Sequence, residues 1–260
     1  MRRDHLARAT AVLAAQLIVS HHPAHALIGA DLVDLSLQRY TVSVASTIGK
    51  CTGVVLAQDV VLTAAHCTQD AAKIRVGGNR GFGDPTAPPV DLSPVTQAIQ
   101  HPRYNAKWLG SPDLALLKLA KPLPDRFSPA YFGGPIPGNG DDLIAVGYGK
   151  SAAVDPRAGT ILRMVLLRVS ERFPTYVTLV RSGEAKAEAG AGDSGGPVFS
   201  YRGMPALVAI MVAHASFETV AIPIAPNFSW INETMAKLGA RDRAQLVVVA
   251  YQTGLVGPDA

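Results

Sequence analysis

The stretch Gly192 to Pro197 reads GDSGGP, a serine enclosed by glycines and followed by a proline. Such a run is typical of a tight turn, because glycine adopts positive φ freely and proline presets its own φ. The same run also leaves backbone N–H groups free beside a serine hydroxyl, which is what an acyl-transfer site needs. The string alone therefore leaves two interpretations open, a turn serine and a nucleophile.

Short apolar runs bounded by turn residues surround this stretch from Leu27 onward. They are YTVSVAST (40–47), TGVVLA (52–57), DVVLTAA (59–65), DLALLKLA (113–120), DLIAVGYG (142–149), TILRMVLLRV (160–169) and ALVAIMVAH (206–214). This pattern predicts an all-β barrel or sandwich rather than alternating strands and helices. Residues 225–240 predict one helix, with an asparagine as its cap candidate and Gly239 as its end. The Gly- and Pro-rich stretches 77–94 and 133–141 predict long loops, the second between two halves of the chain.

The N-terminus is predicted to be an export signal that covers residues 1–26. A basic stretch, MRRDHLAR, precedes the apolar run ATAVLAAQLIV and the small-x-small triplet Ala24-His25-Ala26. The apolar run is shorter than the roughly 20 residues of a bilayer span, so no membrane anchor is expected. A disordered segment or a buried helix is the alternative. The mature chain is expected to begin at Leu27 and to be secreted or periplasmic.

Composition excludes several other classes of function. The chain has 260 residues, of which 48% are hydrophobic and 17% charged, which is typical of a globular protein. The net charge of +4 is partly that of residues 1–26, and no basic stripe with interleaved aromatic residues is present, so nucleic acid is not an expected partner. Cys51 and Cys67 are the two cysteines, and export predicts a disulfide between them. A lone pair without a CxxC companion is a poor zinc site, and no cofactor or metal is expected.

Two further residues carry the chemistry that a nucleophilic serine requires. His66 stands in LTAAHC (62–67), at the end of a β-like run and directly before a cysteine, and Asp113 opens the run DLALLKL. Histidine can take the serine proton at neutral pH and return it to a leaving group. An aspartate can fix the imidazole tautomer and stabilise the imidazolium.

With these three motifs in this order, the chain resembles the trypsin-like serine proteases of the chymotrypsin fold, the S1 family. QHPRY (100–104), VGYG (146–149) and FSWI (228–231) support the resemblance, which extends from Leu27 to Leu238. It implies two six-stranded antiparallel β-barrels packed together with a C-terminal helix, over 27–130 and 131–240. Residues 241–260 would be a C-terminal extension, whose run AQLVVVAYQ predicts an extra strand that packs on its own body or offers an edge to a partner.

The resemblance also implies the roles of the site residues. Ser194 would be the nucleophile, His66 the general base and acid, and Asp113 its orienting partner. The N–H groups of Gly192 and Ser194 would form the oxyanion hole. The implied function is a serine endopeptidase that acts on a protein or peptide substrate through an acyl-enzyme. An esterase of the G-x-S-x-G type is disfavoured, because there the histidine follows the serine.

The resemblance also implies which residues govern specificity and activation. Glu188, six residues before Ser194, would lie at the base of the primary specificity pocket and favour cleavage after Arg or Lys. With Gly190 in place of a loop-clamping cysteine, Glu188 could instead turn into solvent, and Thr219 could shorten the pocket in favour of small residues. The α-ammonium of Leu27, freed by signal cleavage, would pair with Asp193.

The segment after ALVAIM departs from the family pattern. Relatives carry Ser-Trp-Gly there, whereas this chain has Val212, Ala213 and His214. His214 would crowd the groove that binds extended substrates. A catalytically weak or inactive homologue that acts as a binding protein is therefore the alternative function.

Overall fold

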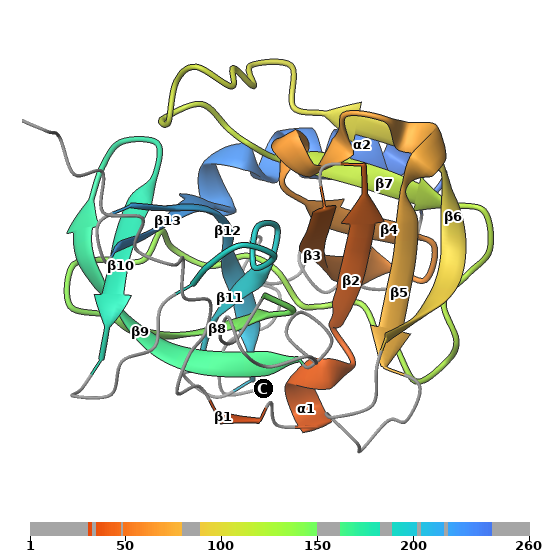
Figure 1. The fold of residues 1–260 in the computed structure, drawn as a ribbon. Helices are drawn as coiled ribbons and strands as arrows, with labels where there is room; N and C mark the ends of the chain where they lie inside the picture. Colours follow the sequence, from red (N-terminus) through yellow and green to blue (C-terminus); the bar gives the residue numbers. More distant parts are fainter. Residues whose placement is uncertain are drawn as a thin grey trace, which may run out of the picture.

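Two β-barrels lie side by side in the computed structural model, which describes residues 31–32, 35–47, 49–79, 89–149, 162–182, 189–201, 204–215 and 218–240 (Figure 1). The strands of one barrel come from residues 41–119 and those of the other from residues 142–223. The expected signal segment, Leu27 and the extension 241–260 lie outside the described residues.

The first barrel is a closed ring of six antiparallel strands, in the order β2-β3-β4-β7-β6-β5. The strands are β2 (Thr41–Ser46), β3 (Gly49–Ala57), β4 (Val60–Thr63), β5 (Arg75–Asn79), β6 (Pro89–Gln100) and β7 (Ala115–Leu119). Leu62, Ile74 and Leu116 are fully buried in its core. The short 3-10 helices η1 (Ala65–Thr68) and η2 (Ala71–Lys73) connect β4 to β5.

The second barrel is closed by β8, which pairs with both β9 and β11. Its strands are β8 (Asp142–Gly147), β9 (Arg163–Arg172), β10 (Val177–Arg181), β11 (Pro197–Ser200), β12 (Ala206–Ala215) and β13 (Glu218–Pro223). The two-residue strand β1 (Asp31–Leu32) pairs with the start of β9, and the one-turn helix α1 (Leu35–Gln38) leads into β2. The predicted all-β fold of two six-stranded antiparallel barrels is confirmed.

The C-terminal helix is confirmed too, although its start differs from the prediction. Helix α2 (Phe228–Lys237) follows the 3-10 turn η3 (Ala225–Asn227) and contacts β7 of the first barrel. Asn227 stands at the N-cap position, but its side chain makes no capping hydrogen bond; its Nδ2 donates to the carbonyl of Pro223 at 2.8 Å. Gly239 ends it with a φ of 74°, a left-handed conformation that favours glycine.

The loop predicted over residues 77–94 is wrong at both ends. β5 continues to Asn79 and β6 begins at Pro89, and the two strands pair with each other. Proline is tolerated as the first residue of a strand and next to a bulge, and a register shift lies close to Pro94. Pairing across the barrel therefore overrides the local turn composition.

Candidate active site

The GDSGGP stretch forms a tight turn directly before β11. Gly192 and Gly195 have φ values of 104° and 82°, which only glycine adopts readily. The N–H of Gly195 donates to the carbonyl of Met211 at 2.7 Å, which ties the turn to β12. A Cβ on Gly195 would collide with Thr52 and Thr63 of the first barrel. The turn thus presents Ser194 at the contact between the two barrels.

His66 and Asp113 are joined by two hydrogen bonds at the same contact. His66 lies in η1, and Asp113 lies two residues before the start of β7. The backbone N–H of His66 donates to Oδ1 of Asp113 at 2.9 Å, and Nδ1 of His66 lies 2.6 Å from Oδ2. The histidine side chain is 28% exposed and the aspartate 15%, so the imidazole reaches solvent while the carboxylate is largely covered.

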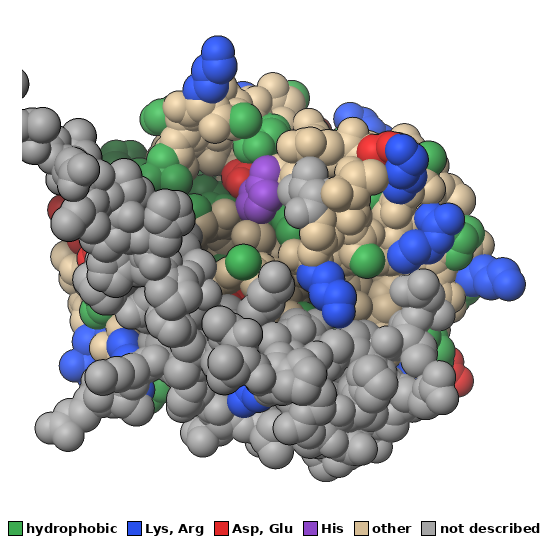
Figure 2. Space-filling model, in the orientation of Figure 1, with side chains coloured by type: hydrophobic (Ala, Val, Ile, Leu, Met, Phe, Trp, Pro, Cys, Tyr) green, Lys and Arg blue, Asp and Glu red, His purple; other side chains and the backbone are tan. Residues whose placement is uncertain are grey.

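Ser194 lies beside the residue that follows His66. The predicted disulfide between Cys51 and Cys67 is present, and Sγ of Cys67 is 4.0 Å from the carbonyl oxygen of Ser194. That oxygen also accepts the N–H of Thr52 at 2.8 Å. The loop of Ser194 therefore lies next to the segment that carries His66, at the contact between the barrels. Figure 2 shows one face of the molecule, on which a histidine and an acidic side chain lie at the edge of a hollow.

The two cysteines and His66 also bring three atoms of the kinds that bind metals, two sulfurs and a ring nitrogen, within 4.8 Å of one another. Both sulfurs are bonded in the disulfide and cannot serve as thiolate ligands. This cluster is therefore a disulfide bond beside the histidine rather than a metal centre.

Asp193 is 1% exposed, and its carboxylate packs against Gly147 and Gly149. Its carboxylate accepts the N–H groups of Gly149 at 2.8 Å and Gly190 at 2.9 Å, and a Cβ on Gly147 or Gly149 would collide with it. Burial raises the pKa of Asp193 to about 7, an effect that the two N–H donors oppose. Its predicted partner, the α-ammonium of Leu27, lies outside the described residues.

A cavity of about 290 Å³ opens beside the serine. Its described walls come from residues 189–194 and from β12, namely Ala189, Gly190, Ala191, Asp193, Ser194, Met211 and Ala213. These side chains are small or apolar apart from Asp193 and Ser194, so the walls leave room for a substrate side chain. Glu188, the residue expected at the base of the pocket, lies outside the described residues, and Thr219 in β13 is not among these wall residues.

The segment that departs from the family pattern lies in β12, next to this cavity. Val212 is 5% exposed and Ala213 forms part of the cavity wall. Ala213 is the smallest side chain that could stand there besides glycine, which leaves this wall short. The side chain of His214 lies outside the described part, so its expected crowding of the substrate groove stays a prediction.

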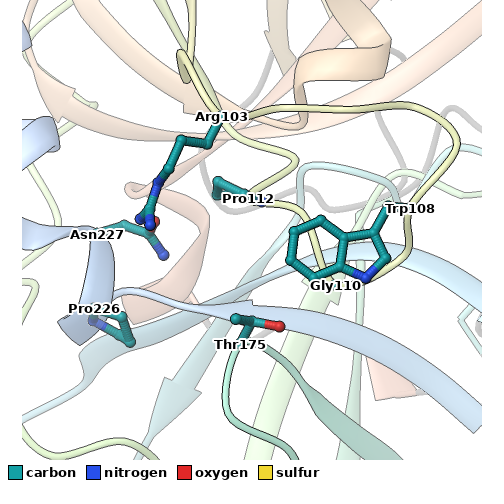
Figure 3. Close-up of a pocket in the computed structure, with 7 residues that line it drawn as sticks. All are labelled: Arg103, Trp108, Gly110, Pro112, Thr175, Pro226 and Asn227. Atoms are coloured by element: carbon teal, nitrogen blue, oxygen red, sulfur yellow. The ribbon is translucent and has the colours of Figure 1, made fainter.

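A second, smaller hollow of about 70 Å³ lies beside Pro112, the residue before Asp113 (Figure 3). It is lined by Arg103, Trp108, Gly110, Pro112, Thr175, Pro226 and Asn227. Arg103 and Trp108 come from the loop before β7, and Thr175 from the turn between β9 and β10. This hollow lies between loops of the two barrels, and neither His66 nor Ser194 lines it.

Thr52, which no motif singled out, joins the serine loop to both barrels. The N–H of Tyr148 donates to Oγ1 of Thr52 at 3.0 Å, and that hydroxyl donates to the carbonyl of Gly192 at 2.8 Å. The residue is fully buried. The only signal in the sequence is a polar side chain that opens the apolar run TGVVLA directly after Cys51.

Known proteins similar to this chain are serine proteases. The family model described as Trypsin matches residues 28–231. Granzyme B of Rattus norvegicus is 26% identical over 209 residues, and kallikrein 1-related peptidase b21 of Mus musculus is 28% identical over 212 residues; each alignment covers 72% of this chain and 80% of the relative.

Two solved structures share the fold. An inactivated protease paralogue of the scabies mite superposes with a TM-score of 0.65 at 22% identity, and mouse neuropsin with 0.63 at 21%. Each comparison covers 80% of this chain and 99% of the other. In the described ranges, none of the helices is long and apolar enough to cross a membrane.

Proposed function

Since the chain belongs to the trypsin family of serine proteases and is a serine endopeptidase, we propose that it cleaves its substrate with the triad Ser194, His66 and Asp113. The observation that carries this proposal is the pair of hydrogen bonds between His66 and Asp113, at 2.9 and 2.6 Å, beside the loop of Ser194. A protein or peptide is the substrate.

Acylation begins when Oγ of Ser194 attacks the scissile carbonyl carbon. Nε2 of His66 takes the hydroxyl proton and passes it to the leaving amine as the C–N bond breaks. Water, activated by the same histidine, then attacks the acyl-enzyme and releases the acid with Ser194 restored. Asp113 holds Nδ1 of the ring throughout, which favours the tautomer with a basic Nε2.

The oxyanion of each tetrahedral intermediate would bind to the N–H groups of Gly192 and Ser194. The positive φ of Gly192 supports this assignment, because it turns the loop in a way that a residue with a Cβ would resist. Removing one donor of such a hole in a serine protease costs about 10²–10³ in kcat.

Substrate side chains would enter the 290 Å³ cavity beside Ser194. Glu188 would give that cavity a preference for Arg or Lys, since a carboxylate in a partly dry pocket favours a guanidinium or an ammonium group. Secretion through a cleaved signal at residues 1–26 would deliver the chain to an oxidising compartment, consistent with the Cys51–Cys67 disulfide.

The test is covalent labelling of the chain that begins at Leu27 with a fluorophosphonate probe, alongside Ser194→Ala. The expected result is one phosphonyl adduct, mapped by mass spectrometry to Ser194, that is lost in Ser194→Ala. A peptide-library digest with the same two proteins should show cleavage only with the unmodified serine. A folded chain that neither labels nor cleaves would instead support the alternative, an inactive homologue that binds its partner.

A further inference from the structure

Both residues assigned to the oxyanion hole are held by one residue of the other barrel. Thr52 lies in β3, between Cys51 and Gly53. Its backbone N–H donates to the carbonyl of Ser194 at 2.8 Å, and its hydroxyl donates to the carbonyl of Gly192 at 2.8 Å. The hydroxyl and the backbone N–H of Thr52 therefore fix the two ends of the three-residue segment from Gly192 to Ser194.

The direction of the Thr52 hydroxyl is set by its second neighbour. A hydroxyl has one hydrogen to donate, and the N–H of Tyr148 occupies an acceptor position on Oγ1 at 3.0 Å. The hydrogen is therefore free to point at Gly192. Thr52 is 0% exposed, so water cannot replace these bonds, and each is stronger than it would be at the surface.

The Thr52 peptide is itself immobilised from the opposite side. Its carbonyl oxygen accepts the hydroxyl of Thr63 at 2.7 Å, and β3 pairs there with β2. Gly195 packs so closely against Thr52 and Thr63 that a Cβ would collide with both. The contact is thus rigid, and a displacement of Thr52 would be transmitted to the serine loop.

From this geometry we infer that Thr52 is a positioning residue for the oxyanion hole, an inference that rests on the proposed protease function. Its hydroxyl fixes the carbonyl of Gly192, and so the conformation of the residue whose N–H faces the developing negative charge. The oxyanion exists only in the tetrahedral intermediates and the transition states that flank them. Loss of the hydroxyl is therefore expected to lower kcat and to leave KM nearly unchanged.

Two variants isolate the hydroxyl, because both lack the methyl group of threonine. Thr52→Ser keeps the hydroxyl and Thr52→Ala removes it. We expect Thr52→Ala to lower kcat by about 10- to 100-fold, below the loss seen when a donor itself is removed, and Thr52→Ser to restore most of that turnover. Affinity for a peptidyl aldehyde, which forms a tetrahedral adduct, should fall with kcat/KM, whereas affinity for a product peptide should not.

Thr41→Ala is the matched control for a purely structural effect. Thr41 is also fully buried in the first barrel, and its hydroxyl donates to the carbonyl of Leu37 at 3.2 Å, away from the serine loop. Thr41→Ala should lower the unfolding midpoint without changing kcat. If Thr52→Ala does not fold, Thr52→Val serves, because it keeps the shape of threonine without the hydroxyl.

The outcomes separate this inference from the function on which it rests. Equal kcat values in Thr52→Ala and Thr52→Ser, or a loss in Thr52→Ala no larger than in Thr41→Ala, would overturn the positioning role while the protease function stood. Unmodified protein that neither labels at Ser194 nor turns over substrate would overturn both. A rise in KM at constant kcat would also overturn the positioning role, because it would place Thr52 in ground-state binding.

Discussion

Asp113 receives two hydrogen bonds from one residue, the backbone N–H of His66 at 2.9 Å and the ring Nδ1 of His66 at 2.6 Å. The backbone bond fixes the carboxylate relative to the η1 turn, and the ring bond fixes the imidazole relative to the carboxylate. Because each bond uses a different carboxylate oxygen, neither group can rotate without breaking one of them. This arrangement makes the imidazole orientation depend on the charge and shape of Asp113.

Asp113→Asn should reduce kcat by about 10⁴, the magnitude that the corresponding substitution has in a Ser-His-Asp triad. The amide can keep the geometry but turns a donor toward Nδ1, which favours the tautomer with a protonated Nε2. The measurement is steady-state hydrolysis of a peptide substrate. Asp142→Asn, at an exposed ion pair with Arg168, is the control and should leave kcat unchanged. Near-normal hydrolysis by Asp113→Asn would remove Asp113 from the triad.

The Cys51–Cys67 disulfide should contribute about 3 kcal/mol to the free energy of unfolding, since it closes a loop with a sequence separation of 16. The double substitution Cys51→Ala with Cys67→Ala, followed by urea unfolding, measures this contribution. Both positions are buried, so the cavity left by the two removed sulfur atoms adds to the measured loss. A change well below 1 kcal/mol would mean that the fold already restrains this loop without the bond.

Local motifs singled out candidate site residues where they lie next to unusual residues in the chain. His66 beside Cys67, Asp113 at the head of an apolar run and Ser194 among glycines could be identified from the sequence, and so could the two barrels. Contacts between distant residues could not. The hydroxyl of Thr52 reaches Tyr148 and Gly192, 96 and 140 positions away, and only the folded barrels bring them together.

The secondary-structure prediction failed where strand pairing outweighed the local amino-acid composition. The segment 77–94 has the glycines and prolines of a loop, yet both of its ends join the first barrel as β5 and β6. Asn227 has the chemistry of a helix cap, but its side chain makes no capping hydrogen bond and donates through Nδ2 to the carbonyl of Pro223. In the segment 77–94, strand pairing decided between two conformations that the local sequence allowed.

Asp193 should make stability depend on whether the chain begins at Leu27. In a chain with extra residues before Leu27, no terminal ammonium is available there, and the pKa of Asp193 stays near 7. The unfolded pKa is about 3.9, so between about pH 4 and pH 7 the folded state binds a proton that the unfolded state releases. The free energy of unfolding of that chain should therefore fall as the pH rises from 4 to 7.

The chain that begins at Leu27 should not show this fall, because its ammonium would stabilise the ionised carboxylate and lower the pKa of Asp193. Urea unfolding of both chains at pH 4 and pH 7 measures the difference. Asp193→Asn in the longer chain is the control, since its amide cannot ionise and the fall should disappear. Equal pH slopes for the two chains would contradict the pairing.

Activity of the chain that begins at Leu27 should decline at alkaline pH for the same reason. The unperturbed pKa of an α-ammonium is about 8, and pairing with Asp193 would raise it. The ion pair, and with it the shape of the serine loop, should be lost as the pH rises through that raised value. One extra residue before Leu27 should abolish most activity at every pH. Full activity of that extended chain would refute activation by signal cleavage.

Specificity should depend on the charge of Glu188. The described walls of the cavity beside Ser194 are mostly small and apolar, so a carboxylate at the base would be the feature that selects a basic side chain. Glu188→Gln keeps the size and removes the charge, and kcat/KM for cleavage after Arg or Lys should drop at least tenfold relative to cleavage after Ala or Val. Glu188→Asp tests length: a shorter carboxylate should favour Arg, the longer of the two substrates, if the pocket is too shallow for it.

Competition digests of one peptide library with the three proteins measure these ratios directly, and Glu171→Gln, at an exposed residue of β9, controls for loss of an acidic charge elsewhere. If Glu188 instead points into solvent, Glu188→Gln and Glu171→Gln should give the same profile as the unmodified enzyme. A preference for small residues in all of these proteins would mean that a facing wall shortens the cavity. In that case the short side chain of Ala213 would not set its depth, and a residue of β13 would have to do so.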